Sequence, residues 1–408
     1  MKGHVFNDLV VAIDIGTTKI SVLIARWQPN NTVDIVGIGN APSDGLKKGV
    51  VVDIARTVQS ISHAVAEAQL MAGCIVEQAC IGISGSHIKS FSSQGMVPLK
   101  RNQVSDEDIQ AVVAAAQAVS LAEGQQILHA LPHYFTLDGQ DKIQDPRGMY
   151  GVRLEANVHI ITGSIASAQN LVRCCEQAGI QVTDIVLEQL ASARAVLSAD
   201  ERELGVGMLD IGGGTSDLAI YLNGAIRYTH VVPVAGNQFT QDLAIGLQTT
   251  LAQAERIKKE FGTVNMPTFD ETIIIAGLEQ DSMQEIWQSD LAAILEPRAS
   301  ELMQHVKKII DKKELNYAMT AGFVLTGGGS QLDGLQELAH EILKVPVRIG
   351  KPRLKDSLFT SLACPIYATG YGLLLYGLEK KTDSSKENAG HVLSRVASRM
   401  KSWVSDFF

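Results

Sequence analysis

Residues 10–19 read Val-Val-Ala-Ile-Asp-Ile-Gly-Thr-Thr-Lys, and residues 206–215 read Val-Gly-Met-Leu-Asp-Ile-Gly-Gly-Gly-Thr. Each stretch is an apolar strand that ends in Asp-Ile-Gly and continues into small polar residues. A second apolar run follows each, at residues 20–25 and 218–222. Two such copies, about 196 residues apart, predict two related lobes rather than a solenoid of short repeats.

Apolar runs of strand length alternate with segments of helical period through most of the chain. Residues 57–71 and 243–261 are predicted to be helices, and residues 272–276 a strand. Alternation of this kind is typical of α/β architecture, in which helices pack on the faces of a sheet.

The composition is that of a globular protein with more than one core. At ~150 residues per domain, the 408 residues suggest two to four domains. A hydrophobic content of 46% with 19% charged residues excludes a mainly disordered chain. The net charge of −9 argues against nucleic acid as a partner, because nucleic-acid binding calls for a basic surface.

The cysteines indicate a reducing compartment. They are Cys74, Cys80, Cys174, Cys175 and Cys364. An odd number without CxxC spacing excludes a disulfide framework and a structural zinc site of the usual kind. The adjacent Cys174 and Cys175 are predicted to pack in a core. His129 and His133 are four residues apart, but Pro132 lies between them, so we do not expect them to bind zinc.

No stretch of the chain has the pattern of a secretory leader or of the ~20 apolar residues that a spanning helix needs. We therefore expect a cytoplasmic protein, apart from what the last eighteen residues add.

Two regions differ in texture from the repeated lobes. Residues 85–161 include a helix opened by Ser105-Asp-Glu-Asp108, a strand at 127–138 broken at Pro132, and a loop at 138–150. The predicted parts are a first-lobe core at 1–84 with 162–195, an inserted small α+β domain at 85–161, a second-lobe core at 196–228 with 304–378, a second insertion at 229–303, a flexible linker at 379–390 and an amphipathic helix at 391–408.

The two Asp-Ile-Gly turns have the chemistry of a phosphate site. A glycine turn after a buried strand leaves backbone N–H groups open to phosphate oxygens. Asp14 and Asp210 are placed to hold Mg²⁺, which takes few protein carboxylates. The predicted phosphate-binding residues are Gly16, Thr17, Thr18 and Lys19 in the first turn and Gly212, Gly213, Gly214 and Thr215 in the second. The alternative is that each turn is only a tight hairpin with a capping Asp.

A third glycine turn follows the predicted strand at Phe323-Val-Leu-Thr. Its residues are Gly327, Gly328, Gly329 and Ser330, and a helix at 336–343 comes next. Three glycines bare a short stretch of backbone, so a flat ring can lie against it. The alternative is a plain strand-to-helix connection. The sequence has no GxxxxGK[ST] and no GxGxxG motif, which disfavours the P-loop and Rossmann folds.

The three turns together resemble the phosphate-1, phosphate-2 and adenosine motifs of the actin, chaperone and sugar-kinase ATPase superfamily. Their order and spacing match over about 370 residues. The resemblance implies a two-lobed fold that binds ATP and Mg²⁺. The insertion at 85–161 and the C-terminal tail are most similar to the FtsA family of bacterial cell-division proteins.

This resemblance implies further site residues. Glu188 matches the position at which bacterial actins orient the attacking water, and Glu255 and Lys258 match a helix that reaches the ribose and adenine. Arg298 and Glu301 resemble part of the surface that binds the C-terminal peptide of FtsZ. The alternatives are a surface carboxylate, a solvated helical ion pair and exposed charges of an ordinary helix.

The tail can be interpreted from its own pattern. At about 100° per residue, its apolar side chains fall in one arc of about 160°. The predicted membrane-facing residues are Leu393, Val396, Met400, Trp403 and Phe407, with Arg395, Arg399 and Lys401 for anionic headgroups. The alternative is a helix that docks on its own protein.

The sequence thus predicts a nucleotide-switched scaffold. The resemblance implies that it self-assembles, binds FtsZ, tethers the division ring to the cytoplasmic face of the inner membrane at the division site and recruits later division proteins, with slow hydrolysis at most. The alternatives are a small-molecule kinase of the same fold and a cell-shape or pilus-assembly relative.

Overall fold

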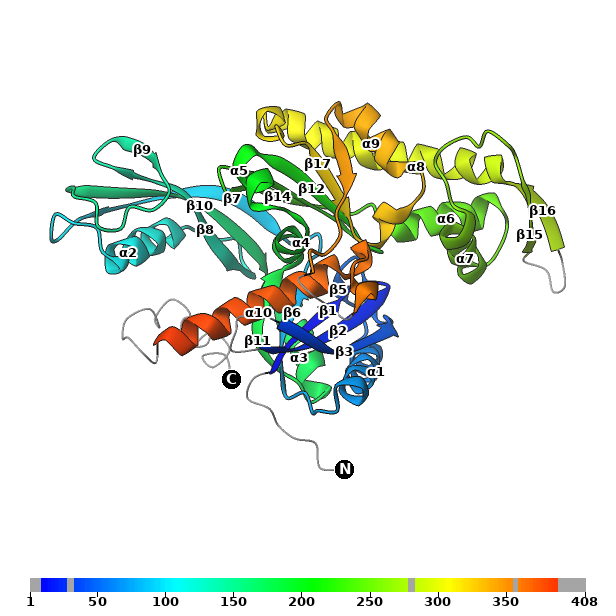
Figure 1. The fold of residues 1–408 in the computed structure, drawn as a ribbon, viewed down its shortest axis with the longest axis horizontal. Helices are drawn as coiled ribbons and strands as arrows, with labels where there is room; N and C mark the ends of the chain where they lie inside the picture. The colour runs from blue at the N-terminus through cyan, green and yellow to red at the C-terminus, as the bar shows by residue number, and fades with distance from the viewer. Residues whose placement is uncertain (1–8, 28–32, 278–282, 355–358, 388–408) are drawn as a thin grey trace.

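The computed structural model describes residues 9–27, 33–277, 283–354 and 359–387. Two five-stranded sheets form the centres of two lobes (Figure 1). The first has the order β11-β6-β1-β2-β3 and the second β18-β17-β12-β13-β14. In each sheet, the first three strands in chain order pair antiparallel, and the next two add to the sheet in parallel. The internal repeat seen in the two motifs therefore extends to whole sheets.

The strands have these bounds. In the first lobe they are β1 Leu9–Ile15, β2 Lys19–Trp27, β3 Val33–Pro42, β6 Gln78–Ile83 and β11 Gln181–Leu187. In the second they are β12 Val206–Ile211, β13 Ser216–Leu222, β14 Ala225–Val232, β17 Phe323–Thr326 and β18 Val347–Ile349. A short hairpin, β4 Leu46–Lys47 with β5 Val50–Val51, follows β3.

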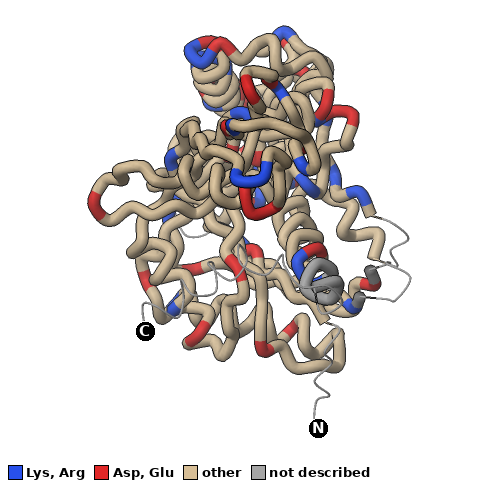
Figure 2. The backbone as a smooth tube through the Cα atoms, turned by 90° about the vertical axis from the view of Figure 1, so that its left-hand side faces the viewer, with Lys and Arg blue, Asp and Glu red and all other residues tan. Residues whose placement is uncertain are grey.

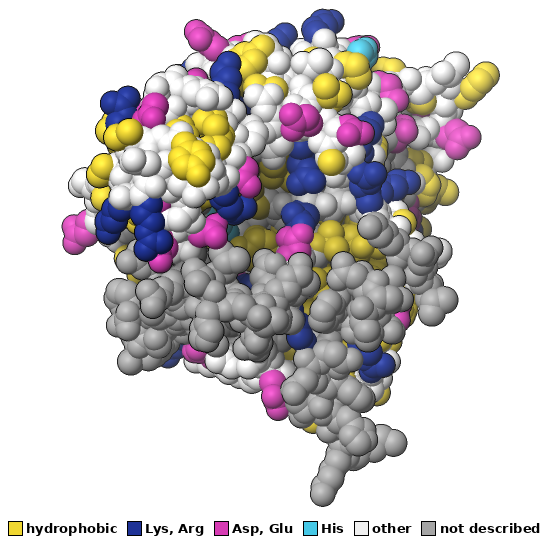
Figure 3. All heavy atoms as spheres, turned by 60° about the vertical axis from the view of Figure 1, so that its left-hand side comes forward, with side chains coloured by type: hydrophobic (Ala, Val, Ile, Leu, Met, Phe, Trp, Pro, Cys, Tyr) yellow, Lys and Arg dark blue, Asp and Glu magenta, His cyan; other side chains and the backbone are white. Residues whose placement is uncertain are grey.

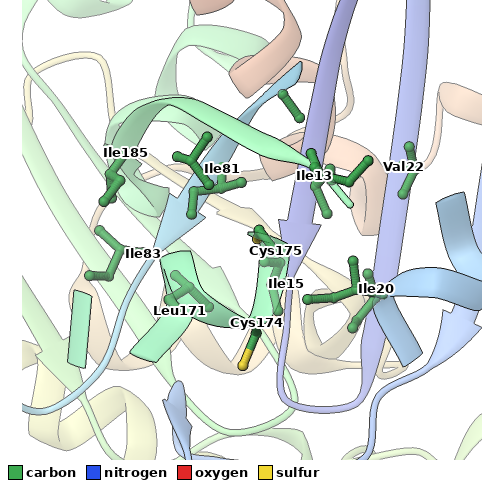
Figure 4. Close-up of a cluster of buried hydrophobic side chains, with 14 of the residues drawn as sticks. Ile13, Ile15, Ile20, Val22, Ile81, Ile83, Leu171, Cys174, Cys175 and Ile185 are labelled. Carbon is green, nitrogen blue, oxygen red and sulfur yellow. The ribbon is translucent and has the colours of Figure 1, made fainter. Parts of the chain in front are cut away.

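Helices cover the first sheet because its strands are apolar on both faces. α1 (Ile54–Ala72) begins at the capping residue Asp53, and α3 (Ile165–Gln177) begins at Ser164. Figure 4 shows Cys174 and Cys175 of α3 lying among the isoleucines of β1, β2 and β6. Both thiols are buried and free, so the prediction that they pack in a core is confirmed.

Two helices connect the lobes. α4 (Glu188–Val196) packs on β12 and β13, and α10 (Ala368–Glu387) packs on β1, β2 and β6. They cross at Gly372, where a Cβ atom would lie 1.8 Å from the carbonyl oxygen of Ala191. Only glycine permits this close crossing. The second lobe is completed by α5 (Ala199–Leu204), α8 (Gln288–Lys312) and α9 (Leu335–Leu343).

A separate sheet with its own core follows β6. Its order is β7-β10-β8-β9, from β7 Lys89–Pro98, β8 Gln125–Leu137, β9 Gln140–Ile143 and β10 Arg153–Ser164, with α2 Asp106–Gln117 on one face. Ser105 caps α2 as expected. β8 is not broken at Pro132, however, because a register shift next to it leaves His133 in a bulge. A bulge tolerates the missing N–H of proline.

The predicted long helix at 243–261 is two helices, α6 (Gly236–Gly246) and α7 (Leu251–Phe261). Gln248 between them has φ +48°, and the Thr250 hydroxyl caps α7 by accepting from the N–H of Gln253. A left-handed residue and a new cap interrupt the helical hydrogen bonds. The hairpin β15 (Thr272–Ala276) and β16 (Met283–Trp287) follows, with β15 at the predicted residues.

The predicted flexible linker at 379–390 is wrong for residues 379–387, which continue α10. Three of its charged side chains have partners elsewhere in the chain: Lys380 pairs with the buried Asp184, Glu379 pairs with Arg194, and the Lys381 ammonium donates to the Leu9 carbonyl at 3.1 Å. These contacts and the helix propensity of Glu and Lys extend the helix. The predicted amphipathic helix at 391–408 lies outside the described residues.

Figure 2 shows Lys and Arg interspersed with Asp and Glu along the chain. Among the helices of the described residues, none combines the length and apolar character that a membrane crossing requires.

Candidate functional site

The two Asp-Ile-Gly turns have the same geometry. In the first, the Gly16 N–H donates to the Lys19 carbonyl at 3.0 Å, and in the second the Gly212 N–H donates to the Thr215 carbonyl at 2.9 Å. Each turn joins two antiparallel strands with the Asp just before it, in β1 and in β12. The repeat is therefore a repeated hairpin, with one copy in each lobe.

The two turns meet face to face. A Cβ atom on Gly213 would lie 2.3 Å from the Thr18 methyl carbon, and one on Gly214 would lie 2.4 Å from the Thr17 hydroxyl oxygen. Any side chain at 213 or 214 would push the lobes apart. The second turn must therefore consist of glycine for the first turn to approach it.

The predicted metal ligands come together at the start of α10. The Thr369 hydroxyl donates to the Asp210 carboxylate at 2.9 Å, and a Cβ atom on the next residue, Gly370, would lie 3.7 Å from the Cβ of Asp14. Both carboxylates are buried. Burial raises the pKa of Asp14 to about 6, Lys19 lowers it, and the charge of Asp210 raises it further.

Lys19 is held beside this pair. Its ammonium donates to the Ile366 carbonyl at 2.9 Å and lies 4.4 Å from the centre of the Tyr367 ring. Burial lowers the pKa of Lys19, while the charges of Asp14 and Asp210 raise it. One cation from the first turn thus faces carboxylates of both lobes.

Asp210 has partners that the sequence did not suggest. Ser192 of α4 also donates to its carboxylate, and the Ser192 and Thr369 hydroxyls lie 3.0 Å apart. These contacts join residues 18 and 159 positions away from Asp210. No local pattern signals such pairs. Both crossing helices are therefore attached to the predicted metal ligand.

Glu188 is the first residue of α4 and is half-buried beside β6, where a Cβ on Gly82 would lie 3.0 Å from its side chain. Burial raises its pKa well above the usual range, and the charges of Asp14, Asp217 and Asp210 raise it further. The structure therefore brings Glu188 to the predicted aspartate pair.

Asp217 is a site residue that sequence reasoning missed. It lies opposite Asp210 in the β12–β13 hairpin and is 3% exposed. Burial raises its pKa to about 7, whereas hydrogen bonds from Ser84 and Thr215 lower it. A signal was available: in an antiparallel hairpin turning at Gly213 and Gly214, the residue facing Asp210 is Asp217.

The donor set fits a cation. Four carboxylates with raised pKa values lie together here (Asp14, Asp210, Asp217 and Glu188), and the Lys19 ammonium acts on two of them, Asp14 and Asp210. A divalent ion would relieve their repulsion. Within the described ranges, no three His, Cys, Asp or Glu side chains are arranged to ligate one metal directly. Mg²⁺, which keeps several waters and uses one or two carboxylates, suits such a site.

The third glycine turn lies against the second. Gly327 has φ +80°, and a Cβ there would lie 2.2 Å from an Asp210 carboxylate oxygen. The Ser330 hydroxyl donates to the Gly327 carbonyl at 2.8 Å, and Ser330 lines a cavity of about 400 Å³. This volume falls in the range of small-molecule pockets. Cys364 and Lys351 also line it.

Glu255 and Lys258 are attached to the second turn rather than to this cavity. The Lys258 ammonium donates to Glu255 at 2.6 Å and to the Gly236 carbonyl at 3.0 Å. The Gly236 N–H in turn donates to the Gly212 carbonyl at 3.0 Å. α7 is thus connected through α6 to the second turn, which is predicted to bind phosphate.

Arg298 and Glu301 lie on α8 and pair with each other. The Arg298 guanidinium also forms a two-point contact with Asp242 of α6, at 2.7 and 3.1 Å. These hydrogen bonds raise the pKa of Arg298. In the described structure, this pair of residues fastens two helices of the second lobe.

Comparison with family models gives two matches. The model of cell division protein FtsA matches residues 207–372, and that of the SHS2 domain inserted in FtsA matches residues 85–162. The chain is 42% identical over 409 residues to the cell division protein FtsA of Pseudomonas aeruginosa, covering 98% of each chain. It is 36% identical over 412 residues to that of Escherichia coli strain K12, again covering 98% of each.

Solved structures share the fold at low identity. The PilM–PilN type IV pilus biogenesis complex matches with a TM-score of 0.66 and 18% identity, over 90% of this chain and 98% of that one. MreB 5 of Spiroplasma citri bound to AMPPNP matches with a TM-score of 0.58 and 15% identity, over 94% and 100%. The MamK double helical filament matches with a TM-score of 0.53 and 15% identity, over 91% and 98%.

The predicted two-lobed actin-like fold with an inserted α+β domain is therefore confirmed. Identity to curated relatives spans nearly the whole chain, and the family models cover both the inserted domain and the second lobe. The chain belongs to the FtsA family of cell-division proteins.

Proposed function

We propose that this protein binds Mg-ATP between its lobes and uses it to set the angle between them. The observation that carries the proposal is the meeting of two matching glycine turns around Asp14, Lys19 and Asp210. The backbone of both turns would hold the phosphates, and Asp14 and Asp210 would hold Mg²⁺ directly or through water. A structural relative, MreB 5, is bound to AMPPNP.

In this proposal Glu188 orients the water that attacks the terminal phosphate. Burial and the neighbouring Asp14 and Asp217 raise the pKa of its carboxyl, which favours a role in accepting a proton. The metal would neutralise phosphate charge. Glu255 and Lys258 would contact the ribose and adenine end, together with Gly327 to Ser330.

We further propose that the protein forms filaments, binds the C-terminal peptide of FtsZ and holds the division ring at the cytoplasmic face of the inner membrane. Membership of the FtsA family and the filament form of MamK support assembly. The tail pattern at residues 391–408 supports membrane binding. Later division proteins would be recruited to this scaffold.

The nucleotide proposal is tested by titrating the full chain with ATP, with and without Mg²⁺, in a calorimeter. We expect Mg²⁺-dependent binding that Asp14→Asn and Asp210→Asn each weaken at least tenfold. The exposed Asp34 provides the control Asp34→Asn, for which no change is expected. Equal binding by all four proteins would contradict the proposal.

The membrane proposal is tested by sedimentation with anionic vesicles. The truncation belongs after Glu387, because α10 continues to that residue and its Lys380 pairs with Asp184 of the first lobe. We expect the full chain to sediment with vesicles and the truncated chain to stay in solution. FtsZ polymer should sediment with vesicles only when the full chain is present, and equal recovery with either chain would contradict tethering.

A further inference from the structure

Ser84 occupies a place that joins three parts of the molecule. It is the first residue after β6, so it belongs to the first lobe, and the chain leaves it toward β7 of the inserted domain. Its side chain, however, reaches the second lobe: the Ser84 hydroxyl donates to an Asp217 carboxylate oxygen at 2.6 Å. This residue is 2% exposed, so the bond is shielded from water.

Asp217 also connects Ser84 to the second glycine turn. The Thr215 hydroxyl donates to the other oxygen of Asp217 at 3.1 Å and lies 3.5 Å from the Ser84 hydroxyl. Thr215 closes the turn through its carbonyl, which accepts from the Gly212 N–H. Two hydrogen bonds thus separate the root of the inserted domain from the predicted phosphate site.

The first turn is linked to Ser84 through Gly49. A Cβ on Gly49 would lie 2.9 Å from the Ser84 carbonyl oxygen, and the Gly49 N–H donates to the Thr17 hydroxyl at 3.0 Å. A shift of the first turn would therefore reach Ser84 through Gly49, and a shift of the second turn would reach it through Asp217 and Thr215.

The inserted domain is attached to both lobes. It is covalently joined to the first lobe, while on the second lobe the Thr229 carbonyl accepts from the Ser90 hydroxyl at 2.9 Å and the Thr229 hydroxyl lies 3.0 Å from the His159 ring nitrogen. Arg227 of the same strand, β14, lies 3.5 Å from His133. A change in the angle between the lobes must therefore move or strain this domain.

We infer that Ser84 is a positioning residue that transmits occupation of the phosphate site, through Asp217 and Thr215, to the orientation of the inserted domain. This inference rests on the proposed ATP binding and adds a consequence of that binding, a change in the orientation of the inserted domain. When phosphates bind the second turn, Thr215 and Asp217 move together, and the Ser84 hydroxyl carries that movement to the start of β7. Without the hydroxyl, binding and domain orientation are uncoupled.

The test measures binding and orientation separately. Spin labels at Leu70→Cys on α1 and Tyr150→Cys on the inserted domain, 87% and 78% exposed, report the distance between the first lobe and that domain. Cys364→Ser removes the cysteine that is not buried, and the other four are buried. Figure 3 shows the side on which the inserted domain comes forward, with charged and apolar groups open to solvent. ATP affinity is measured by calorimetry on the same proteins.

With Ser84 intact, we expect Mg-ATP to shift the distance distribution. Ser84→Ala should bind Mg-ATP within threefold of the parent yet show no shift, and Ser84→Thr, which keeps the hydroxyl, should restore it. Ser92→Ala, on the exposed part of β7, is the matched control and should behave as the parent. Ser84→Gly, which also lacks the hydroxyl, provides a second route to the same loss if Ser84→Ala does not fold.

The outcomes separate the two proposals. If the parent binds no Mg-ATP, the proposed function fails and the inference fails with it. If the parent binds but its distance does not change, or Ser84→Ala shifts as the parent does, only the inference is overturned. If Ser84→Thr lacks the shift as Ser84→Ala does, the hydroxyl is not the link, which also overturns the inference.

Discussion

Replacing His159 by Gln should make the protein more resistant to acid. His159 lies in β10 of the inserted domain and is 1% exposed. Its ring stacks on His133 with 5.4 Å between centroids, and Arg227 approaches His133 at 3.5 Å. Burial, and then the neighbouring His133, lower the pKa of His159 to about 3. The folded protein therefore keeps this ring neutral where the unfolded chain would protonate it.

The direction of the change in stability with pH follows from the number of protons that the folded and the unfolded state bind. Below pH 6.5 the unfolded chain binds a proton at His159 and the native state does not, so stability is lost as the pH falls from 6.5 toward 3. Above pH 6.5 both states are neutral and nothing changes. At 1.36 kcal/mol per pH unit, His159 alone lowers the free energy of unfolding by about 2 kcal/mol at pH 5. Glutamine cannot titrate, and its side-chain amide can form a hydrogen bond with the Thr229 hydroxyl in place of the ring.

The assay is urea unfolding followed by circular dichroism at pH 7.5 and pH 5. Both proteins should lose stability between pH 7.5 and pH 5. We expect the loss of unfolding free energy to be about 2 kcal/mol smaller in His159→Gln than in the parent. His63, exposed on α1, gives the control His63→Gln, whose loss should equal that of the parent. An equal loss in all three proteins would contradict a neutral, buried His159 in the folded protein.

Three further predictions concern packing and charge. Gly372→Val should destabilise the protein by about 3 kcal/mol or more in urea unfolding, because the added atoms meet the Ala191 carbonyl where α4 and α10 cross; wild-type stability would contradict that crossing. Asp242→Ala should cost about 1–2 kcal/mol in the same assay by removing the two-point partner of Arg298, and Asp242→Asn should cost less. Asp14→Asn should leave thermal melting without ligand at or above that of the parent, since it removes one of several clustered negative charges, while abolishing the stabilisation by Mg-ATP; equal stabilisation by Mg-ATP in both would argue against a metal at Asp14.

Local patterns predicted much of the fold. The ends of β15 fall at the predicted residues, and the cap of α2 is Ser105 as expected. Apolar runs, glycine turns and capping residues act over a few positions, so their signals survive in the sequence. The split of the predicted helix at 243–261 was missed because Gln248 in a left-handed conformation has no reliable local signature.

The extension of α10 through residues 379–387 shows the limit of composition. A polar, charged segment looks like a linker, yet Glu379, Lys380 and Lys381 find partners on the first lobe. Those partners are Arg194, Asp184 and Leu9, which lie far away in the sequence. Whether a charged segment is held or released depends on such distant partners.

The repeated apolar run, Asp and glycine turn are enough to predict two copies of one hairpin, and hence two lobes. That Asp14, Lys19, Asp210 and Glu188 lie together, with Ser84 and Asp217 beside them, is seen only once the chain is folded. Turns and strands depend on residues that are close together in the sequence. The charges of the site instead depend on which segments, far apart in the sequence, are brought together when the core packs.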